Sequence, residues 1–174
     1  MKPIALVTGA TSGFGKATAE RFAREGWNII ITGRREERLT VLKNELESAH
    51  SIQAQTLAFD VQSLDACRAA LNSLSDDWKS IDVLVNNAGL ALGRESFVDG
   101  SIDQWNTMID TNIKGLLYIS QIVAPWMIAR KFGTIIGDGV HTGINTSIYP
   151  GRKFWPNTTT RPGEIVQHDI QSQD

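Results

Sequence analysis

The chain lacks the features that mark secreted, membrane-spanning or nucleic-acid-binding proteins. Its single cysteine, Cys67, excludes an internal disulfide and a thiol metal cluster, as is typical of a reducing cytosol. No apolar run approaches the roughly 20 residues of a membrane helix. The net charge of −2 gives no excess of positive charge for nucleic acid or membranes. The three histidines lie far apart in the sequence, so we expect no metal site. We expect a cytoplasmic protein without a signal peptide.

Over the first 136 residues, strand and helix patterns alternate with short connections. This alternation predicts an α/β fold with a doubly wound parallel sheet of the Rossmann type. With 174 residues, of which 41% are hydrophobic, the chain can bury one substantial core. Apolar strand patterns cover residues 4–7, 27–32, 52–59, 81–85 and 134–136, and helix patterns cover 16–25, 35–47, 63–74 and 102–130, the last containing Pro125 as a candidate bend.

The regular pattern is lost near the carboxyl end. Residues 141–174 hold three of the five prolines and show neither a helical nor a strand period. We therefore predict a dinucleotide-binding domain over residues 1–140 and an atypical, poorly ordered tail over 141–174. An ordinary carboxyl-terminal extension would explain the change. A truncated or frameshifted gene product, with the sheet incomplete at this end, would also explain it.

The most informative segment is Thr8–Gly15, which reads Thr-Gly-Ala-Thr-Ser-Gly-Phe-Gly. It follows the first apolar strand pattern and opens a helical pattern. Side chains are missing where a backbone must approach a pyrophosphate, and a helix N-terminus offers free N–H groups and a partial positive charge. The glycine spacing, G-x-x-x-G-x-G, differs from the G-x-G-x-x-G of the common dinucleotide fingerprint, so it needs support from the rest of the chain.

That support comes from the ends of the later strand patterns, because ligands of open parallel sheets lie beyond the carboxyl ends of the strands. Arg34 and Arg35 follow the second strand, where a guanidinium fork suits a ribose 2′-phosphate, which favours NADP over NAD. Asp60 and Val61 follow the third strand, and Asn86–Gly89 follows the fourth. Each segment also has a plainer interpretation. Arg34 and Arg35 can be a solvated helix start, Asp60 a helix cap, and Asn86–Gly89 a turn.

Together these segments resemble the short-chain dehydrogenase/reductase family in order and spacing. The resemblance covers roughly residues 1–136 and rests on Thr8-Gly9-x3-Gly13-x-Gly15, Asp60-Val61, Asn86-Asn87-Ala88-Gly89 and Thr111-Asn112-Ile113-Lys114-Gly115. Further motifs, at residues 32–39, 87–93 and 108–112, resemble the bacterial NADP-dependent 3-hydroxy acid dehydrogenases. The resemblance implies an NADP-dependent oxidoreductase that acts on a small molecule such as serine or allo-threonine.

The resemblance also assigns roles to single residues. It gives Gly9, Ser12, Gly13, Phe14 and Gly15 to the pyrophosphate, Arg34 and Arg35 to the 2′-phosphate, Asp60 and Val61 to adenine, and Asn86, Ala88 and Gly89 to the ribose beside the nicotinamide. Asn112 matches the family's helix-bending asparagine, which holds a water of the proton relay.

The proton-transfer residues of the family are not matched in place. Its catalytic Ser, Tyr and Lys positions fall at Val140, Trp155 and Thr159. Tyr149 and Lys153 have the family's Tyr-x3-Lys spacing, which puts two side chains on one helical face, but Pro150 and Gly151 stand between them.

Two hypotheses follow. The chain is an oxidoreductase that uses Tyr149 and Lys153, or it is a catalytically inactive NADP-binding half-domain. The family forms homo-oligomers through the long fourth helix and the helix after it. Because the pattern of that second helix is missing here, we expect oligomer formation to be impaired.

Overall fold

The computed structural model describes residues 2–93, 95–136, 147–148 and 165–166. The chain divides into two compact units, residues 1–136 and 137–174. In the second unit, β6 (Ser147–Ile148) pairs in parallel with β7 (Ile165–Val166). Tyr149 and Lys153 lie outside the described residues, as do Val140, Trp155 and Thr159. The predicted disorder of the tail falls almost wholly outside them too, so it stays a prediction.

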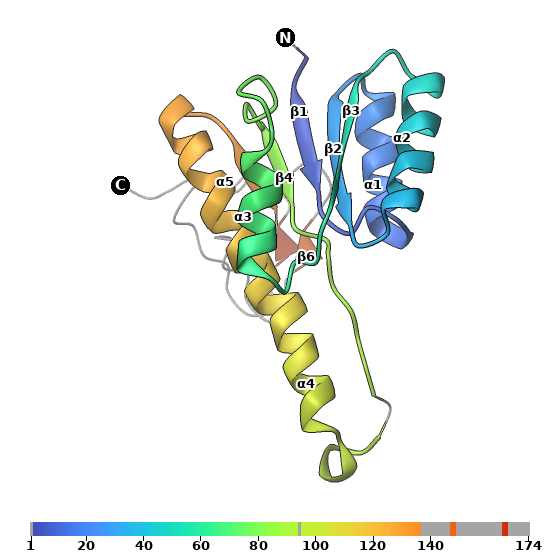
Figure 1. The fold of residues 1–174 in the computed structure, drawn as a ribbon, viewed down its shortest axis with the longest axis vertical. Helices are drawn as coiled ribbons and strands as arrows, with labels where there is room; N and C mark the ends of the chain where they lie inside the picture. The colour runs from blue at the N-terminus through green and yellow to red at the C-terminus, as the bar shows by residue number, and fades with distance from the viewer. Residues whose placement is uncertain (1, 94, 137–146, 149–164, 167–174) are drawn as a thin grey trace. The chain divides into compact units, whose positions relative to one another are not determined.

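The first unit is built on a five-stranded parallel sheet with the order β3-β2-β1-β4-β5 (Figure 1). Its strands are β1 (Ile4–Val7), β2 (Asn28–Gly33), β3 (Ala54–Ala58), β4 (Val83–Val85) and β5 (Thr134–Ile136). The central strands read as unbroken apolar runs because helices cover both faces of the sheet. The predicted doubly wound α/β fold is confirmed.

Alternate side chains of the central strands point to opposite faces of the sheet and pack in two separate hydrophobic cores. Ala5, Val7, Ile29 and Ile31 pack beneath α1 (Gly13–Arg24) and α2 (Glu36–Ala49). Leu6 and Ile30 point to the opposite face and join the core that contains α3 (Leu64–Asn72) and α5 (Leu116–Arg130). Figure 1 shows α1 and α2 on one side of the sheet and α3 and α5 on the other. Because the helices cover the two faces of the sheet, a binding site can form at its carboxyl edge.

The predicted long helix over residues 102–130 is present with an interruption. It consists of α4 (Ile102–Ile109), a π-helical turn over Asp110–Gly115 and then α5, and a short 3-10 turn (Phe97–Asp99) precedes it. Pro125 lies inside α5. At Gly115 the helix packs closely on the chain after β3, since a Cβ there would lie 2.8 Å from Val61 Cγ2. π-turns of this kind often occur at functional sites.

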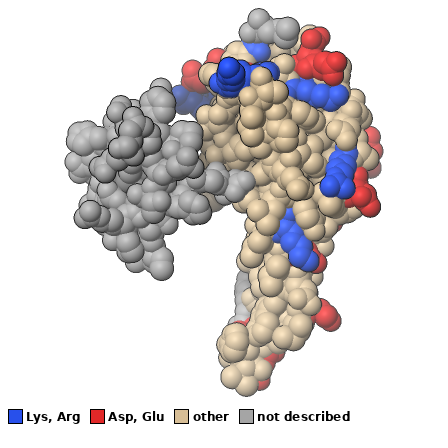
Figure 2. Space-filling model, turned by 90° about the vertical axis from the view of Figure 1, so that its left-hand side faces the viewer, with Lys and Arg blue, Asp and Glu red and all other residues tan. Residues whose placement is uncertain are grey.

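An apolar stripe follows the outer side of this long helix. Ile102, Ile109, Ile113 and Leu117 are between 45% and 61% exposed. In Figure 2 the arm formed by α4 is mostly uncharged, and elsewhere on that face Lys and Arg are interspersed with Asp and Glu rather than gathered in one patch. Impaired oligomer formation stays a prediction.

Asp82 joins three parts of the first unit. One carboxylate oxygen accepts a hydrogen bond from the Ile4 amide at 2.8 Å, and the other lies 3.3 Å from the Arg130 guanidinium at the end of α5. The Asp82 side chain is only 15% exposed. We predict that Asp82→Ala lowers the free energy of unfolding by about 2 kcal/mol, because the partly buried Arg130 guanidinium and the Ile4 amide lose their acceptor. Denaturant unfolding measures it.

The matched control for this prediction is Asp76→Ala. Asp76 also pairs with a cation, Lys79, at 3.3 Å, but its side chain is 99% exposed. Exposed pairs contribute about 0–1 kcal/mol, so the control should be close to the wild type. Equal losses in the two variants would contradict the role assigned to Asp82.

Candidate functional site

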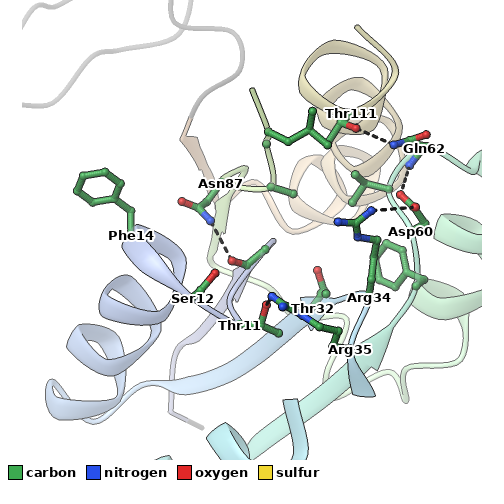
Figure 3. Close-up of a pocket in the computed structure, with 17 residues that line it drawn as sticks. Thr11, Ser12, Phe14, Thr32, Arg34, Arg35, Asp60, Gln62, Asn87 and Thr111 are labelled. Atoms are coloured by element: carbon green, nitrogen blue, oxygen red, sulfur yellow. Dashed lines mark hydrogen bonds and ion pairs between the residues drawn. The ribbon is translucent and has the colours of Figure 1, made fainter. Parts of the chain in front are cut away.

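A pocket of about 340 Å³ opens at the carboxyl edge of the sheet (Figure 3). Its walls are the segments that follow β1, β2, β3 and β4, together with the π-helical turn. The lining residues are Gly9, Thr11, Ser12, Phe14, Thr32, Gly33, Arg34, Arg35, Phe59, Asp60, Val61, Gln62, Asn87, Ala88, Gly89, Leu90 and Thr111. The pocket therefore lies where open parallel sheets bind their ligands.

The glycine turn after β1 has a backbone that only glycine fits. Gly9 has φ +65°, and a Cβ there would lie 2.8 Å from the Ala88 Cα. A Cβ on Gly15 would overlap the Gly9 carbonyl and the Asn87 side chain. Helix α1 begins at Gly13, its N-cap Ser12 makes no side-chain capping bond, and its first turn holds no acidic residue. The turn thus forms a concave wall that ends in a helix N-terminus, which suits a phosphate.

Hydrogen bonds fix this turn to the segment after β4. Thr8 Oγ1 accepts from the Asn87 and Ala88 amides, each at 2.9 Å. The Asn87 side chain donates in return to the carbonyls of Thr8, at 2.9 Å, and Gly9, at 3.2 Å. Figure 3 shows the Asn87 side chain directed at the turn. Two walls of the pocket are held together in this way.

The wall after β2 carries two guanidinium groups. Arg34 Nη1 lies 3.9 Å from Asp60 Oδ2, and the Arg35 guanidinium donates to Thr11 Oγ1 at 3.1 Å. The Arg34 side chain is 66% exposed and that of Asp60 is 41% exposed. The pair is therefore weakened by solvent, and both arginines are available to an anion at the rim.

The wall after β3 combines apolar surface with a polar relay to the long helix. Phe59 and Val61 are each 8% exposed. The Gln62 amide donates to Asp60 Oδ1 at 3.0 Å, and its side-chain nitrogen donates to Thr111 Oγ1 at 2.8 Å. Apolar side chains beside oriented polar groups suit a flat heteroaromatic ring.

Cys67 is buried beneath this wall and is not among the residues that line the pocket. Its Sγ contacts the Val61 carbonyl at 3.6 Å. Burial, and to a lesser degree the nearby Asp60 carboxylate, raises the pKa of the Cys67 thiol to about 11. The thiol stays protonated at neutral pH and acts as a small apolar side chain.

Two buried polar atoms have no hydrogen-bond partner within the described part of the chain. One is Thr32 Oγ1, and the other is Asn86 Oδ1. The Asn86 side-chain nitrogen donates to Ser120 Oγ in α5 at 2.9 Å. Buried polar atoms without partners are uncommon in folded proteins.

The structure brings most of the predicted site residues to one pocket. The residues that line it are Gly9, Ser12, Phe14, Arg34, Arg35, Asp60, Val61, Ala88 and Gly89. Gly13, Gly15, Asn86 and Asn112 are not among the lining residues. The Asn112 side chain instead holds the chain after β4: it donates to the Leu90 carbonyl and accepts from the Leu90 amide, both at 2.8 Å. The individual roles stay predictions.

Several lining residues were not singled out from the sequence as site residues. They are Thr11, Thr32, Gly33, Phe59, Gln62, Asn87, Leu90 and Thr111. Most of them are sequence neighbours of predicted residues, and the rule that ligands lie beyond strand ends could have extended to them. Thr111 comes from the long helix, and only the packing of that helix against Val61 brings it here.

Within residues 2–93, 95–136, 147–148 and 165–166, no group of three or more His, Cys, Asp or Glu side chains could hold a metal ion. Over the same ranges, every helix is too short or too polar to cross a membrane.

Comparison with known proteins identifies relatives over this same region. A model of the short chain dehydrogenase family matches residues 3–154. The NADP-dependent 3-hydroxy acid dehydrogenase of Salmonella typhi is 49% identical over 140 residues, which are 80% of this chain and 55% of that protein. The serine 3-dehydrogenase of Rhizobium radiobacter is 51% identical over 127 residues, or 72% of this chain and 49% of that protein.

A solved structure agrees with these sequence relatives. A closed form of serine dehydrogenase in complex with NADP+ superimposes with a TM-score of 0.70 at 46% identity, covering 81% of this chain and 54% of that chain. The present chain therefore spans about half the length of the curated relatives it matches.

Proposed function

Because the chain belongs to the short-chain dehydrogenase family, we propose that its pocket binds NADP and that the protein oxidises or reduces a small 3-hydroxy acid or its carbonyl counterpart. One observation carries the proposal: the glycine turn and the two guanidinium groups of Arg34 and Arg35 border one pocket. The turn suits a pyrophosphate, and the guanidinium groups suit a 2′-phosphate. NAD, which lacks that phosphate, fits the rim less well.

The residues present fit the cofactor in shape as well as in charge. The contact between Gly9 and Ala88 leaves no room for a side chain, so the wall stays a bare backbone. Asp60 and Val61 offer a polar edge and an apolar face to adenine. In this proposal, Gly89 and its neighbours, which Asn112 orders through Leu90, face the nicotinamide half.

Bound NADP would supply the hydride acceptor or donor of the reaction. The chain's own part is to orient the cofactor and to move a proton to or from the substrate oxygen. We assign that proton transfer to Tyr149, with Lys153 lowering its pKa by favouring the phenolate. Asn112 would position the water of the proton relay. Both Tyr149 and Lys153 lie outside the described residues, so this assignment rests on their Tyr-x3-Lys spacing.

The names of the relatives indicate a substrate class for the proposal. A serine 3-dehydrogenase and a 3-hydroxy acid dehydrogenase are the kinds of protein that this chain is similar to. Their substrates carry a hydroxyl two carbons from a carboxylate. We propose the same class for this protein, working in the cytoplasm.

The test has a binding arm and a turnover arm. Purified full-length chain is titrated with NADPH and with NADH while its tryptophan fluorescence is followed. NADP+ is then mixed with serine, allo-threonine or 3-hydroxypropionate, with lactate, a 2-hydroxy acid, as the control, and NADPH is read by absorbance. We expect tighter binding of NADPH than of NADH, and turnover of the 3-hydroxy acids that Tyr149→Phe abolishes.

The outcomes separate the hypotheses. Tight NADPH binding without turnover would favour the inactive half-domain over the enzyme. Absence of NADPH binding would overturn the proposal as a whole.

A further inference from the structure

A single hydrogen bond joins the Arg35 side chain to the glycine turn. Arg35 is the N-cap residue of α2, and its Nη2 donates at 3.1 Å to Oγ1 of Thr11, which lies 24 positions earlier in the chain. Figure 3 shows the Arg35 guanidinium directed at Thr11 and the Arg34 guanidinium directed at Asp60. All four residues line the pocket. The two arginines are therefore held by different kinds of partner.

The two partners differ in charge. Asp60 is a carboxylate, so it already balances part of the positive charge of Arg34. Thr11 offers a neutral hydroxyl, and the Arg35 guanidinium forms no ion pair with any of the described residues. A hydroxyl oxygen can orient a guanidinium without neutralising it. Arg35 therefore keeps its full charge for an anion that enters the pocket.

The backbone and the side chain of Thr11 are both held in place. One residue before Thr11, the Ala10 amide donates to the Thr32 carbonyl at 3.0 Å and joins the glycine turn to β2. The Thr11 methyl group lies close to Gly33, since a Cβ on Gly33 would be 3.0 Å from Thr11 Cγ2. Because a β-branched side chain has few χ1 rotamers, the position of the methyl group also sets the direction of the hydroxyl. Thr11 thus presents its oxygen to Arg35 from a fixed support.

We propose that Thr11 is a positioning residue for the 2′-phosphate of NADP and acts through Arg35, an inference that rests on the proposed function. A free arginine side chain loses rotamer freedom when it closes on a ligand, and this loss weakens binding. The bond to Thr11 removes part of that freedom before the ligand arrives. It occupies one N–H of the guanidinium and leaves the others for phosphate oxygens. Thr11 therefore contributes to the preference for NADP over NAD, although it carries no charge.

The test uses Thr11→Val, which keeps the branched shape and removes the oxygen, and Thr11→Ser, which keeps the oxygen. NADPH and NADH are titrated separately against each purified full-length protein by calorimetry. Thr11→Val should weaken NADPH binding about fivefold and change NADH binding by less than about twofold, because NADH has no 2′-phosphate. Thr11→Ser should bind NADPH within about twofold of the wild type.

Thr40→Val is the matched control. Thr40 is an exposed threonine of α2 whose hydroxyl donates to the Glu36 carbonyl at 3.1 Å, and it does not line the pocket. The control should bind both cofactors as the wild type does. Ligand-free Thr11→Val should unfold at nearly the wild-type temperature, because the bond that it loses is exposed. If Thr11→Val does not fold, Thr11→Ala, which also lacks the oxygen, replaces it with the same expectations.

A double-mutant cycle with Arg35→Ala separates positioning from direct contact. If Thr11 acts through Arg35, Thr11→Val should change NADPH affinity by less than about twofold once Arg35 is already alanine. A fivefold loss that persists in the absence of Arg35 would mean that Thr11 contacts the ligand itself.

Three results would overturn the inference. They are wild-type NADPH binding by Thr11→Val, equal losses of affinity for NADPH and NADH, and the same loss of NADPH affinity with and without Arg35. Each of them leaves the proposed function standing as long as the wild type prefers NADPH to NADH. A wild type that binds no NADPH would overturn both the proposed function and the inference.

Discussion

Replacing Gly9 with alanine should abolish NADPH binding and lower the free energy of unfolding by about 3 kcal/mol. Part of the loss comes from the backbone, because φ is +65° and a left-handed conformation costs an ordinary residue about 1–2 kcal/mol. The rest comes from overpacking, since the new Cβ would lie 2.8 Å from the Ala88 Cα. The contact is backbone on backbone, so relieving it moves two walls of the pocket apart. Denaturant unfolding and NADPH titration measure the two effects.

Gly26→Ala is the matched control for this substitution. Gly26 also has a positive φ, +84°, but a Cβ there would meet nothing within 4 Å, and Gly26 does not line the pocket. The control should lose about 1–2 kcal/mol of stability and bind NADPH as the wild type does. If Gly9→Ala behaved like Gly26→Ala in both measurements, the close approach of Gly9 to Ala88 would matter neither for stability nor for NADPH binding.

The second large effect is expected at the rim. Replacing Arg34 and Arg35 together with alanine should weaken NADPH binding about 100-fold and change NADH binding by less than about threefold. A hydrogen bond to a charged group contributes about 1.5–3 kcal/mol, and two such bonds to one phosphate give at least two factors of ten. Stability should hardly change, because the Arg34–Asp60 pair is exposed and 3.9 Å long.

Arg38→Ala separates a specific contact from a general loss of charge. Arg38 lies in α2, is exposed and does not line the pocket, so its removal changes the net charge without touching the site. The control should keep its preference for NADPH. Equal losses of affinity for NADPH and for NADH in the double variant would show that the arginines act on something other than the 2′-phosphate.

The fold and the pyrophosphate wall could be predicted from the sequence because both depend on local patterns. Unbroken apolar runs indicate strands buried on both faces, and a glycine run between a strand and a helix leaves few alternatives. The basic residues after β2 followed from the same rule about strand ends. These inferences needed only neighbours in sequence.

The remaining contacts depend on residues that are distant in the chain. The bonds from Asn87 to Thr8 and Gly9 join residues 79 and 78 positions apart, and the Gln62–Thr111 bond joins residues 49 apart. No spacing rule reveals such pairs. The unpaired hydroxyl of Thr32 is equally invisible, because a threonine in a strand pattern looks like any other β-branched residue. The roles of Tyr149 and Lys153 stay predictions, since both lie outside the described residues.

The hydrogen bonds of Thr8 and Asn87 affect how the width of the pocket can change. Thr8 and Gly9 follow β1 and Asn87 and Ala88 follow β4, and four hydrogen bonds of 2.9–3.2 Å join the two segments. On the opposite side of the pocket, the Arg34 side chain makes an exposed 3.9 Å ion pair and the Arg35 side chain makes one hydrogen bond. We therefore expect the Arg34 and Arg35 side chains to move more readily than the glycine turn when a nucleotide enters.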